Sequence, residues 1–251
     1  MECVVCGDTE GRTIKGQKKI VSPGRIEWDN HMRTHLPYRR WCPHCVGAKR
    51  KSDAHKEEED GMKEEEGVPR IAFDYMWQKS EEGKTEKIDS LPILVSFESD
   101  VKWVSANMVP EKGVEGYAVQ AVGREIDLAG LRRMIIKSDQ EPAIVDLLRV
   151  VKSERPESIE LQPEESPVGE SASNSEVERA IQTAQGQIRA LRSSMEHRYK
   201  CTIKEDHCIW PWLIMYAAIL INICLVGDDG RTAYERRKGR KFKRDLPEIG
   251  E

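Results

Sequence analysis

The chain has 251 residues, of which 38% are hydrophobic and 33% are charged. This length suits one sizeable domain with smaller appendages, and the large charged fraction excludes a chain that lies wholly in one packed core. The formal net charge of −4 conceals a segregated pattern, because residues 11–56 and 231–244 are basic whereas 57–66 and 154–178 are acidic. Basic ends suit a polyanion partner, although solvated surface charge is the simpler interpretation of each run taken alone.

The first 56 residues form a basic region that is rich in cysteine and histidine. His31 and His35 are four residues apart, and Cys42 and Cys45 follow as C-x-x-C. Histidines at this spacing share one face of a helical turn, and C-x-x-C forms a tight knuckle. These four side chains therefore predict a tetrahedral structural Zn²⁺ site. The alternative is a pair of surface histidines with unliganded thiols.

Cys3 and Cys6 form a second C-x-x-C and offer competing ligands for the same ion. Charged residues begin at Glu2, so we expect no secretory signal. An intracellular chain keeps its thiols reduced, and this setting favours metal binding over disulfide formation.

An acidic linker is predicted over residues 57–67, and regular structure follows it. Apolar alternation and helical spacing indicate three strands, a helix, a strand, a helix, a strand and a helix. This order predicts an α/β fold, with a mixed five-stranded sheet and helices packed on its faces. The expected strands are 70–77, 91–98, 101–109, 132–137 and 158–161, and the expected helices are 111–131, 142–151 and 175–197. The first of these helices is expected to bury Val114, Ala118, Ala121, Val122, Ile126 and Leu128.

An apolar segment lies near the C-terminal end of the chain. Residues 209–226 are almost wholly apolar and about long enough to cross a bilayer, and a basic stretch follows them. Pro211 and Asn222 interrupt the segment, and a helix that is buried on all sides is also apolar all round. Hydropathy alone therefore leaves a membrane span and a buried helix as equal alternatives.

Three acidic side chains stand where the predicted elements make them chemically useful. Asp74 lies inside the first strand, where an ionised side chain is costly unless it is exposed or binds a cation. Asp139 follows a strand, at the carboxyl end where open α/β sheets place their sites. Glu178 lies in the first turn of the long helix. Such carboxylates can converge on hard divalent cations, although 44 Asp and Glu residues make a chance trio easy to assemble.

Four segments carry a resemblance to a known family. F-D-Y-M-W at 73–77, I-I-K-S-D-Q-E-P-A-I at 135–144 and S-P-V-G-E-S-A-S-N-S-E-V-E-R at 166–179 are similar to the segments around the three catalytic acids of Copia-type retrotransposon integrases. The gap between the last two acids is near that of the D,D-35-E pattern. D-G-R-T-A-Y-E-R-R-K-G-R-K at 229–241 is similar to the T-P-Y-E-x-x-x-G-x-K signature that follows the core. The resemblance covers residues from about Trp28 to the end.

The resemblance implies a ribonuclease H-like fold and DDE chemistry, that is, metal-dependent phosphodiester cleavage followed by strand transfer. It implies that Asp74 bridges two Mg²⁺ or Mn²⁺ ions, that Asp139 completes one site and that Glu178 completes the other. Glu176 is the alternative third acid, but the Glu-Arg pair and the helix frame of the family match Glu178. Residues two apart on a helix do not share a face, so only one of the two is expected to coordinate.

The resemblance also implies DNA partners, namely element ends and target DNA, and a homo-oligomer. The long helix faces DNA in integrases, and Gln and Arg suit contacts to phosphates and base edges. We expect action on chromosomal DNA in the nucleus after synthesis in the cytoplasm. The predicted DNA-binding residues, on this helix and in the basic tail, are Arg179, Gln182, Gln185, Arg189, Arg237, Lys238, Arg240 and Lys241.

Family members place an apolar helix against the core at the position of residues 209–226, so the resemblance favours a buried helix and no membrane. The predicted organisation is a zinc-binding region (1–56), an acidic linker (57–67), a catalytic core (68–200), and an apolar helix with a basic extension (201–251). Two alternatives to an active integrase stay open. One is a catalytically dead DNA-binding relic of a retrotransposon polyprotein, and the other is a single-pass membrane protein.

Overall fold

A computed structural model describes residues 21–49, 67–77, 91–165 and 175–247. Cys3, Cys6 and most of the acidic linker lie outside the described residues. The helices are α1 (Arg25–Thr34), α2 (Pro43–Lys49), α3 (Gly116–Ala129), α4 (Pro142–Glu154), α5 (Ser175–Tyr199), α6 (Trp210–Cys224) and α7 (Ala233–Lys238). The strands are β1 (Arg70–Met76), β2 (Ile93–Glu98), β3 (Trp103–Met108), β4 (Arg133–Ser138) and β5 (Glu160–Glu165).

The five strands form one mixed sheet in the order β3-β2-β1-β4-β5. β1, β2 and β3 are antiparallel neighbours, whereas β4 is parallel to β1 and β5 is parallel to β4. β2 and β3 are joined by a short turn, whereas the parallel strands β4 and β5 are reached through the helices α3 and α4, because parallel neighbours need a long connection. The predicted α/β fold, a mixed five-stranded sheet with flanking helices, is confirmed.

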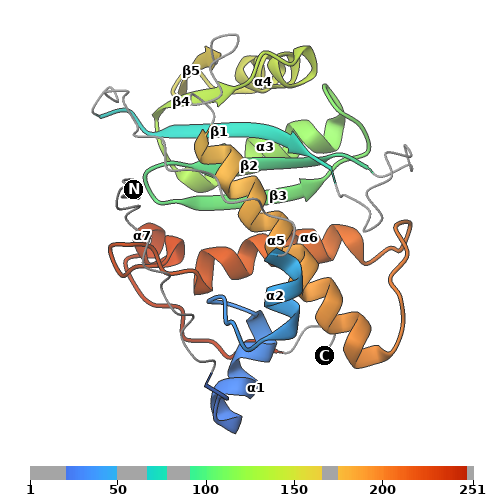
Figure 1. The fold of residues 1–251 in the computed structure, drawn as a ribbon. Coiled ribbons are helices and arrows are strands. Elements are labelled where there is room, and N and C mark those ends of the chain that lie inside the picture. Colours follow the sequence, from blue (N-terminus) through green and yellow to red (C-terminus); the bar gives the residue numbers. More distant parts are fainter. Residues whose placement is uncertain (1–20, 50–66, 78–90, 166–174, 248–251) are drawn as a thin grey trace, which may run out of the picture.

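Side-chain alternation along β1 separates two cores, one on each face of the sheet. Ile71, Phe73 and Tyr75 lie in the core that α3 and α4 cover, and Met76 lies in the core that α5 and α6 cover. Asp74 alternates with Phe73 and Tyr75, so its side chain belongs to the face of α5. Figure 1 shows α5 lying across this face and continuing to α1 and α2.

The helix predicted over 111–131 begins later than its apolar spacing indicated. α3 starts at Gly116 because the Glu115 carboxylate caps it, accepting hydrogen bonds from the backbone N–H groups of Tyr117 and Ala118. The expectation that Val114 and Leu128 are buried is wrong, since they are 53% and 54% exposed. Val114 precedes the cap and therefore lies outside the helical frame from which its burial was predicted.

The apolar segment over 209–226 forms α6, which packs on β3 and α5. Asn222, 1% exposed, makes two hydrogen bonds to the backbone of Val104: its side-chain oxygen accepts from the N–H (2.9 Å) and its amide donates to the carbonyl (2.7 Å). β3 is an edge strand, so this amide occupies backbone groups that the sheet leaves unpaired. Within the described residues, no helix is both long and apolar enough to cross a bilayer, and α6 has 15 residues.

Replacing Asn222 with leucine is expected to destabilise the fold by about 2–4 kcal/mol, because two buried backbone groups would lose their partners at about 1–3 kcal/mol each. Urea unfolding of the purified chain measures this difference. Leu128→Ala on α3 is the control, since Leu128 is 54% exposed and its truncation should change stability by less than about 0.5 kcal/mol. Equal effects of the two substitutions would contradict the role given to Asn222.

Candidate active site and metal centre

The backbone brings Asp74 and Asp139 to the same end of two neighbouring strands. The parallel register pairs Phe73 with Ser138, so extending it by one residue sets Asp74 beside Asp139. Each aspartate is held by a backbone donor. The N–H of Tyr75 donates to Asp74 Oδ1 at 2.7 Å, and the N–H of Glu141 donates to Asp139 Oδ1 at 3.1 Å. This is the carboxyl end of the parallel strands, where α/β proteins place their sites.

Glu178 approaches the same end of the sheet from α5. It lies in the first turn of the helix and is exposed, whereas Val177 beside it is buried against the sheet. An acidic side chain in a first turn is stabilised by the positive end of the helix dipole. The three predicted acids thus come from β1, from the end of β4 and from α5.

Burial and mutual repulsion raise the pKa of Asp74 to about 6. Desolvation is the largest cause, and the negative charges of Asp139, Glu178 and Glu141 add to it, while the hydrogen bond from the Tyr75 N–H opposes the shift. Because these charges act on Asp74, the carboxylates lie within electrostatic range of one another. A divalent cation would relieve it, so the residues present fit a cation.

The pKa of Asp74 predicts a pH-dependent stability change. Its value in the fold exceeds the ordinary value of 3.8, so its contribution to stability is present below pH ~4 and lost as the pH rises through about 6. Asp74→Asn, which keeps an acceptor for the Tyr75 N–H, is therefore expected to stabilise the metal-free protein at pH 7 by on the order of 1–2 kcal/mol, with no gain at pH 4. Urea unfolding at both pH values measures this.

The control for that experiment is Asp146→Asn. Asp146 forms an exposed ion pair with Arg149 (2.6 Å), and such pairs contribute at most about 1 kcal/mol. An Asp74→Asn gain of equal size at pH 4 and pH 7 would contradict the assigned pKa.

The two candidates for the third acid have different surroundings. Ser99 Oγ and Lys102 Nζ donate to the carboxylate of Glu176 at 2.6 and 3.1 Å. Burial opposes ionisation of Glu176, but these contacts lower its pKa below the ordinary value. The carboxylate of Glu176 therefore already accepts two hydrogen bonds within the fold. Glu178, by contrast, contributes to the field at Asp74.

Sequence reasoning missed two residues beside the acids. Glu141, at the position preceding α4, is one of the charges that raise the pKa of Asp74. Lys112 Nζ lies 2.7 and 2.8 Å from the two carboxylate oxygens of Glu141. Neither position belongs to a recognisable spacing pattern, because the pair joins two loops that are 29 residues apart.

The four zinc-ligand candidates, His31, His35, Cys42 and Cys45, come together in a second, separate cluster. All four are buried, and their ligand atoms lie within 4.8 Å of one another. His31 Nε2 lies 3.4 Å from the Sγ of Cys45, and His35 Nδ1 lies 3.4 Å from the Sγ of Cys42. His35 ends α1 in the left-handed conformation (φ 56°), which turns the chain toward the knuckle. The predicted grouping is confirmed.

The cluster fits one Zn²⁺ ion. Hydrogen bonding from Cys45, and less strongly from His31 and His35, lowers the pKa of Cys42 to about 2 against the effect of burial, and a thiolate is the form that binds zinc. The remaining ring nitrogens, His31 Nδ1 and His35 Nε2, are buried without a hydrogen-bond partner. Within the described residues this is the one group compact enough for a single ion.

The zinc-ligand cluster is tied to α5 rather than standing apart from it. Gln187 donates to the carbonyl of Thr34 at 2.6 Å, Arg189 Nε donates to the carbonyl of Ala48 at 3.0 Å, and His44 Nδ1 lies 2.8 Å from Ser193 Oγ. The part of α5 beyond Glu178 is therefore a docking surface for α1 and α2.

Some of the predicted DNA-binding residues have partners within the fold. Arg189 contacts α2, and the buried side chain of Arg237 forms an ion pair with Glu98 and lies 4.0 Å from the ring centroid of Trp103. Gln185 is half-buried and donates to the carbonyl of Trp77 at 3.4 Å. The residues that remain exposed are Arg179, Gln182, Lys238, Arg240 and Lys241.

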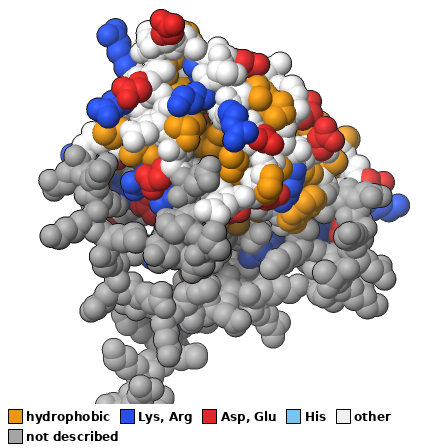
Figure 2. Space-filling model, turned by 90° about the horizontal axis from the view of Figure 1, so that it is seen from above, with side chains coloured by type: hydrophobic (Ala, Val, Ile, Leu, Met, Phe, Trp, Pro, Cys, Tyr) orange, Lys and Arg blue, Asp and Glu red, His pale blue; other side chains and the backbone are white. Residues whose placement is uncertain are grey.

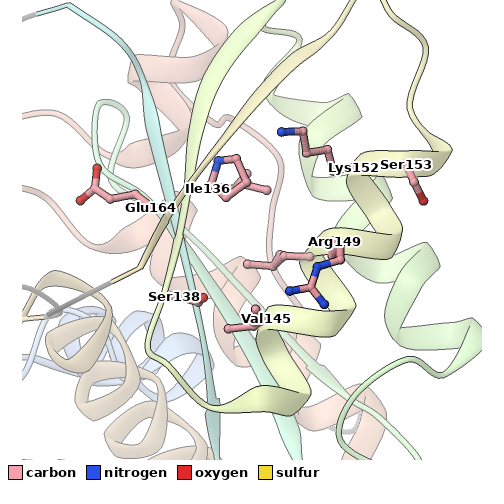
Figure 3. A pocket seen from close by; sticks show the side chains of 9 residues that line it. Ile136, Ser138, Val145, Arg149, Lys152, Ser153 and Glu164 are labelled. Carbon is pink, nitrogen blue, oxygen red and sulfur yellow. The ribbon is translucent and has the colours of Figure 1, made fainter. Parts of the chain in front are cut away.

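A pocket of about 560 Å³ lies between α4 and the strands β4 and β5. Figure 3 shows Ser138 and Ile136 on β4 facing Val145 and Arg149 of α4. Ile136 and Leu148 belong to the core of α3 and α4, so the pocket opens on the face of the sheet opposite to Asp74. The pocket is therefore distinct from the acidic site. Figure 2 shows acidic and basic side chains mixed with hydrophobic ones on the face seen from above.

Two solved structures are similar to this chain. A chain of the simian T-cell lymphotropic virus intasome, determined in complex with the PP2A regulatory subunit B56 gamma, is 14% identical with a TM-score of 0.48, and the match covers 72% of this chain and 57% of that one. The HTLV-2 integrase catalytic core domain in complex with magnesium is 15% identical with a TM-score of 0.43, covering 67% and 95%. This chain thus spans less than two thirds of the first. No family model and no curated protein matches the chain.

Proposed function

We propose that this chain is a retrotransposon integrase of the Copia type, which cleaves and joins DNA phosphodiesters with the help of divalent cations. The observation that carries the proposal is the parallel register of β1 and β4, which when extended by one residue sets Asp74 beside Asp139, together with the charges of Asp139 and Glu178 that act on Asp74. Burial is the largest cause of the raised pKa of Asp74, and these charges add to it. The resemblance of the three surrounding segments to integrases supports the same residues.

Each acid has a distinct role in the proposed site. Asp74 would contact two Mg²⁺ or Mn²⁺ ions, Asp139 would complete the first site and Glu178 the second. Two such ions activate an attacking oxygen and stabilise the leaving oxygen of a phosphodiester. The backbone donors of Tyr75 and Glu141 fix the orientation of the two aspartates, which limits the reorganisation needed when substrate arrives.

DNA is the proposed partner, as element ends and as target. Arg179 and Gln182 are exposed on α5, the first directly after Glu178 and the second one turn later. Both would contact phosphates of a bound DNA strand. Lys238, Arg240 and Lys241 are exposed at and beyond the end of α7 and would add salt-dependent phosphate contacts. We place the activity on chromosomal DNA in the nucleus, after synthesis in the cytoplasm.

Two further proposals concern zinc and self-association. His31, His35, Cys42 and Cys45 would hold a structural Zn²⁺ ion that fixes α1 and α2 against α5. An apolar stripe of α6, formed by Trp212, Met215 and Ile219, is exposed at 42%, 38% and 51%. Exposed apolar stripes on a helix are typical of interfaces, so this stripe supports the proposed homo-oligomer.

Strand transfer in vitro tests the proposed activity. The full chain is incubated with a labelled oligonucleotide end and Mg²⁺ or Mn²⁺, and joined products are resolved by size. The proposal predicts joining in the presence of metal and none in the presence of a chelator. Binding of DNA without any joined or cleaved product, in either metal, would overturn it in favour of a DNA-binding relic.

A further inference from the structure

The loop that precedes α3 touches the acidic site through one lysine. Lys112 Nζ binds both carboxylate oxygens of Glu141, and the two side chains are only 27% and 31% exposed. The ammonium group also lies 5.0 Å from the ring centroid of Tyr75 and 5.6 Å from that of Trp77. A half-buried, two-oxygen contact over two aromatic rings holds the lysine in one place far better than an exposed ion pair would.

The partner of this lysine belongs to the acidic site itself. The backbone N–H of Glu141 donates to Asp139 Oδ1, while its carboxylate is close enough to Asp74 to act on it electrostatically. Glu141 precedes α4 but makes no side-chain cap on that helix, because its carboxylate is turned to Lys112 instead. Glu141 is thus a fourth carboxylate, close in sequence to Asp139, and the ammonium group of Lys112 binds it.

The loop of Lys112 is itself anchored. The N–H of Gly113 donates to the hydroxyl of Tyr75 at 3.0 Å, and Gly113 adopts φ 97°, a conformation that side chains rarely allow. Ala143, at the start of α4, lies 3.8 Å from where a Gly113 side chain would begin. The loop is therefore fixed to both β1 and α4, and it presents Lys112 at a defined position.

We propose that Lys112 is a positioning residue of the acidic site, which holds Glu141 outside the metal-binding set so that Asp74, Asp139 and Glu178 alone meet the cations. The inference rests on the proposed function. Without the lysine, the free carboxylate of Glu141 faces the ions, adds a negative charge and competes as an oxygen ligand. The ions are then bound more tightly but in a geometry that no longer suits phosphodiester chemistry.

Calorimetric titration of the full chain with Mn²⁺, paired with the strand-transfer assay, tests this role. Lys112→Met is expected to tighten Mn²⁺ binding by about three- to tenfold and to reduce strand transfer. Glu141→Gln is expected to weaken binding by a similar factor, because it leaves an unpaired ammonium beside the ions. The double variant should return to within about twofold of the wild-type affinity, since Glu141→Gln removes the carboxylate that Lys112→Met would otherwise free.

Controls separate this role from a structural one. Lys152→Met removes an exposed lysine of α4 and should leave both measurements unchanged. Lys112→Arg keeps the cation and should restore wild-type affinity. Thermal unfolding reports whether each variant is folded, and Glu141→Gln decides the question if Lys112→Met does not fold.

Two results would overturn the proposal in different ways. Wild-type protein that binds no Mn²⁺ would remove the proposed function, and this inference with it. Wild-type protein that binds Mn²⁺, with Lys112→Met and Glu141→Gln both at wild-type affinity, would overturn the role of Lys112 alone. A double variant that binds Mn²⁺ as tightly as Lys112→Met would do the same, because the freed carboxylate of Glu141 would then not be the cause of the tighter binding.

Discussion

Glu178→Gln is expected to lower the rate of strand transfer by at least about 10³-fold, whereas Glu176→Gln on the same helical turn should retain most of it. The physical reason is that a metal-binding carboxylate contributes several kcal/mol to stabilisation of the transition state, and each 1.36 kcal/mol changes the rate about tenfold. Glu178 is exposed at the site and acts on Asp74, while Glu176 is bound to Ser99 and Lys102.

Stability separates these two variants in the opposite sense. Glu176→Gln should lower the free energy of unfolding by about 1–2 kcal/mol, because two charge-assisted hydrogen bonds are weakened. Glu178→Gln, at an exposed position beside like charges, should not destabilise the metal-free protein. Strand-transfer rates and urea unfolding are measured on both. Loss of transfer in Glu176→Gln with retention in Glu178→Gln would reverse the assignment of the third acid.

Removing zinc is expected to unfold α1 and α2 and to lower the melting temperature of the chain by about 10 °C. Structural zinc sites supply folding free energy directly, and a change of 1 kcal/mol shifts the melting temperature by about 2–4 °C in chains of this size. The loss extends beyond the cluster because Gln187 and Arg189 of α5 bond to Thr34 and Ala48. Both α5 side chains lose these partners when α1 and α2 unfold.

Two treatments reach the same end point and check one another. Chelation of the metal and the substitution Cys42→Ser should each reduce helical circular dichroism and the melting temperature, and emission spectrometry should find one zinc per chain beforehand. Cys208→Ser is the matched control, because Cys208 is exposed and far from the cluster in sequence. A chain that contains no zinc as purified, and is unchanged by the chelator, would contradict the structural role.

Local sequence patterns predicted the scaffold well where burial alone decides the element. The strand around Asp74 and the helix around Glu178 follow from alternation and helical spacing, and both lie within a few residues of their predicted bounds. The start of α3 was predicted too early, because apolar spacing continues through Val114 while the chain itself begins the helix only after the Glu115 cap. A helix cap depends on a single side chain, and the spacing of apolar residues carries no information about it.

The roles of charged side chains were harder to predict, since charge pattern does not record the partner. Arg189 and Arg237 have the composition of a DNA-binding surface, yet one holds α2 and the other is paired with Glu98. Lys112 and Glu141 carry no motif, but the loops bring them together beside Asp74. Such long-range pairs follow from topology, which sequence spacing does not contain.

Asn222 illustrates the reverse case, in which an exception to the pattern had a structural reason. Within an apolar segment it counted against a membrane span, and it is buried because it bonds to both backbone groups of Val104. The sequence showed only an interruption of the apolar segment, and the fold shows that the interruption serves the edge strand β3.

We propose that Asp74, Asp139 and Glu178 together bind the two cations of a DNA-joining enzyme. Anomalous diffraction from crystals of the full chain soaked in Mn²⁺ is the decisive experiment, because it locates each ion independently of activity. Two peaks ~3.5–4 Å apart are expected, with Asp74 contacting both, Asp139 one and Glu178 the other. Absence of any peak at these carboxylates, or a peak held by Glu176 in place of Glu178, would contradict it.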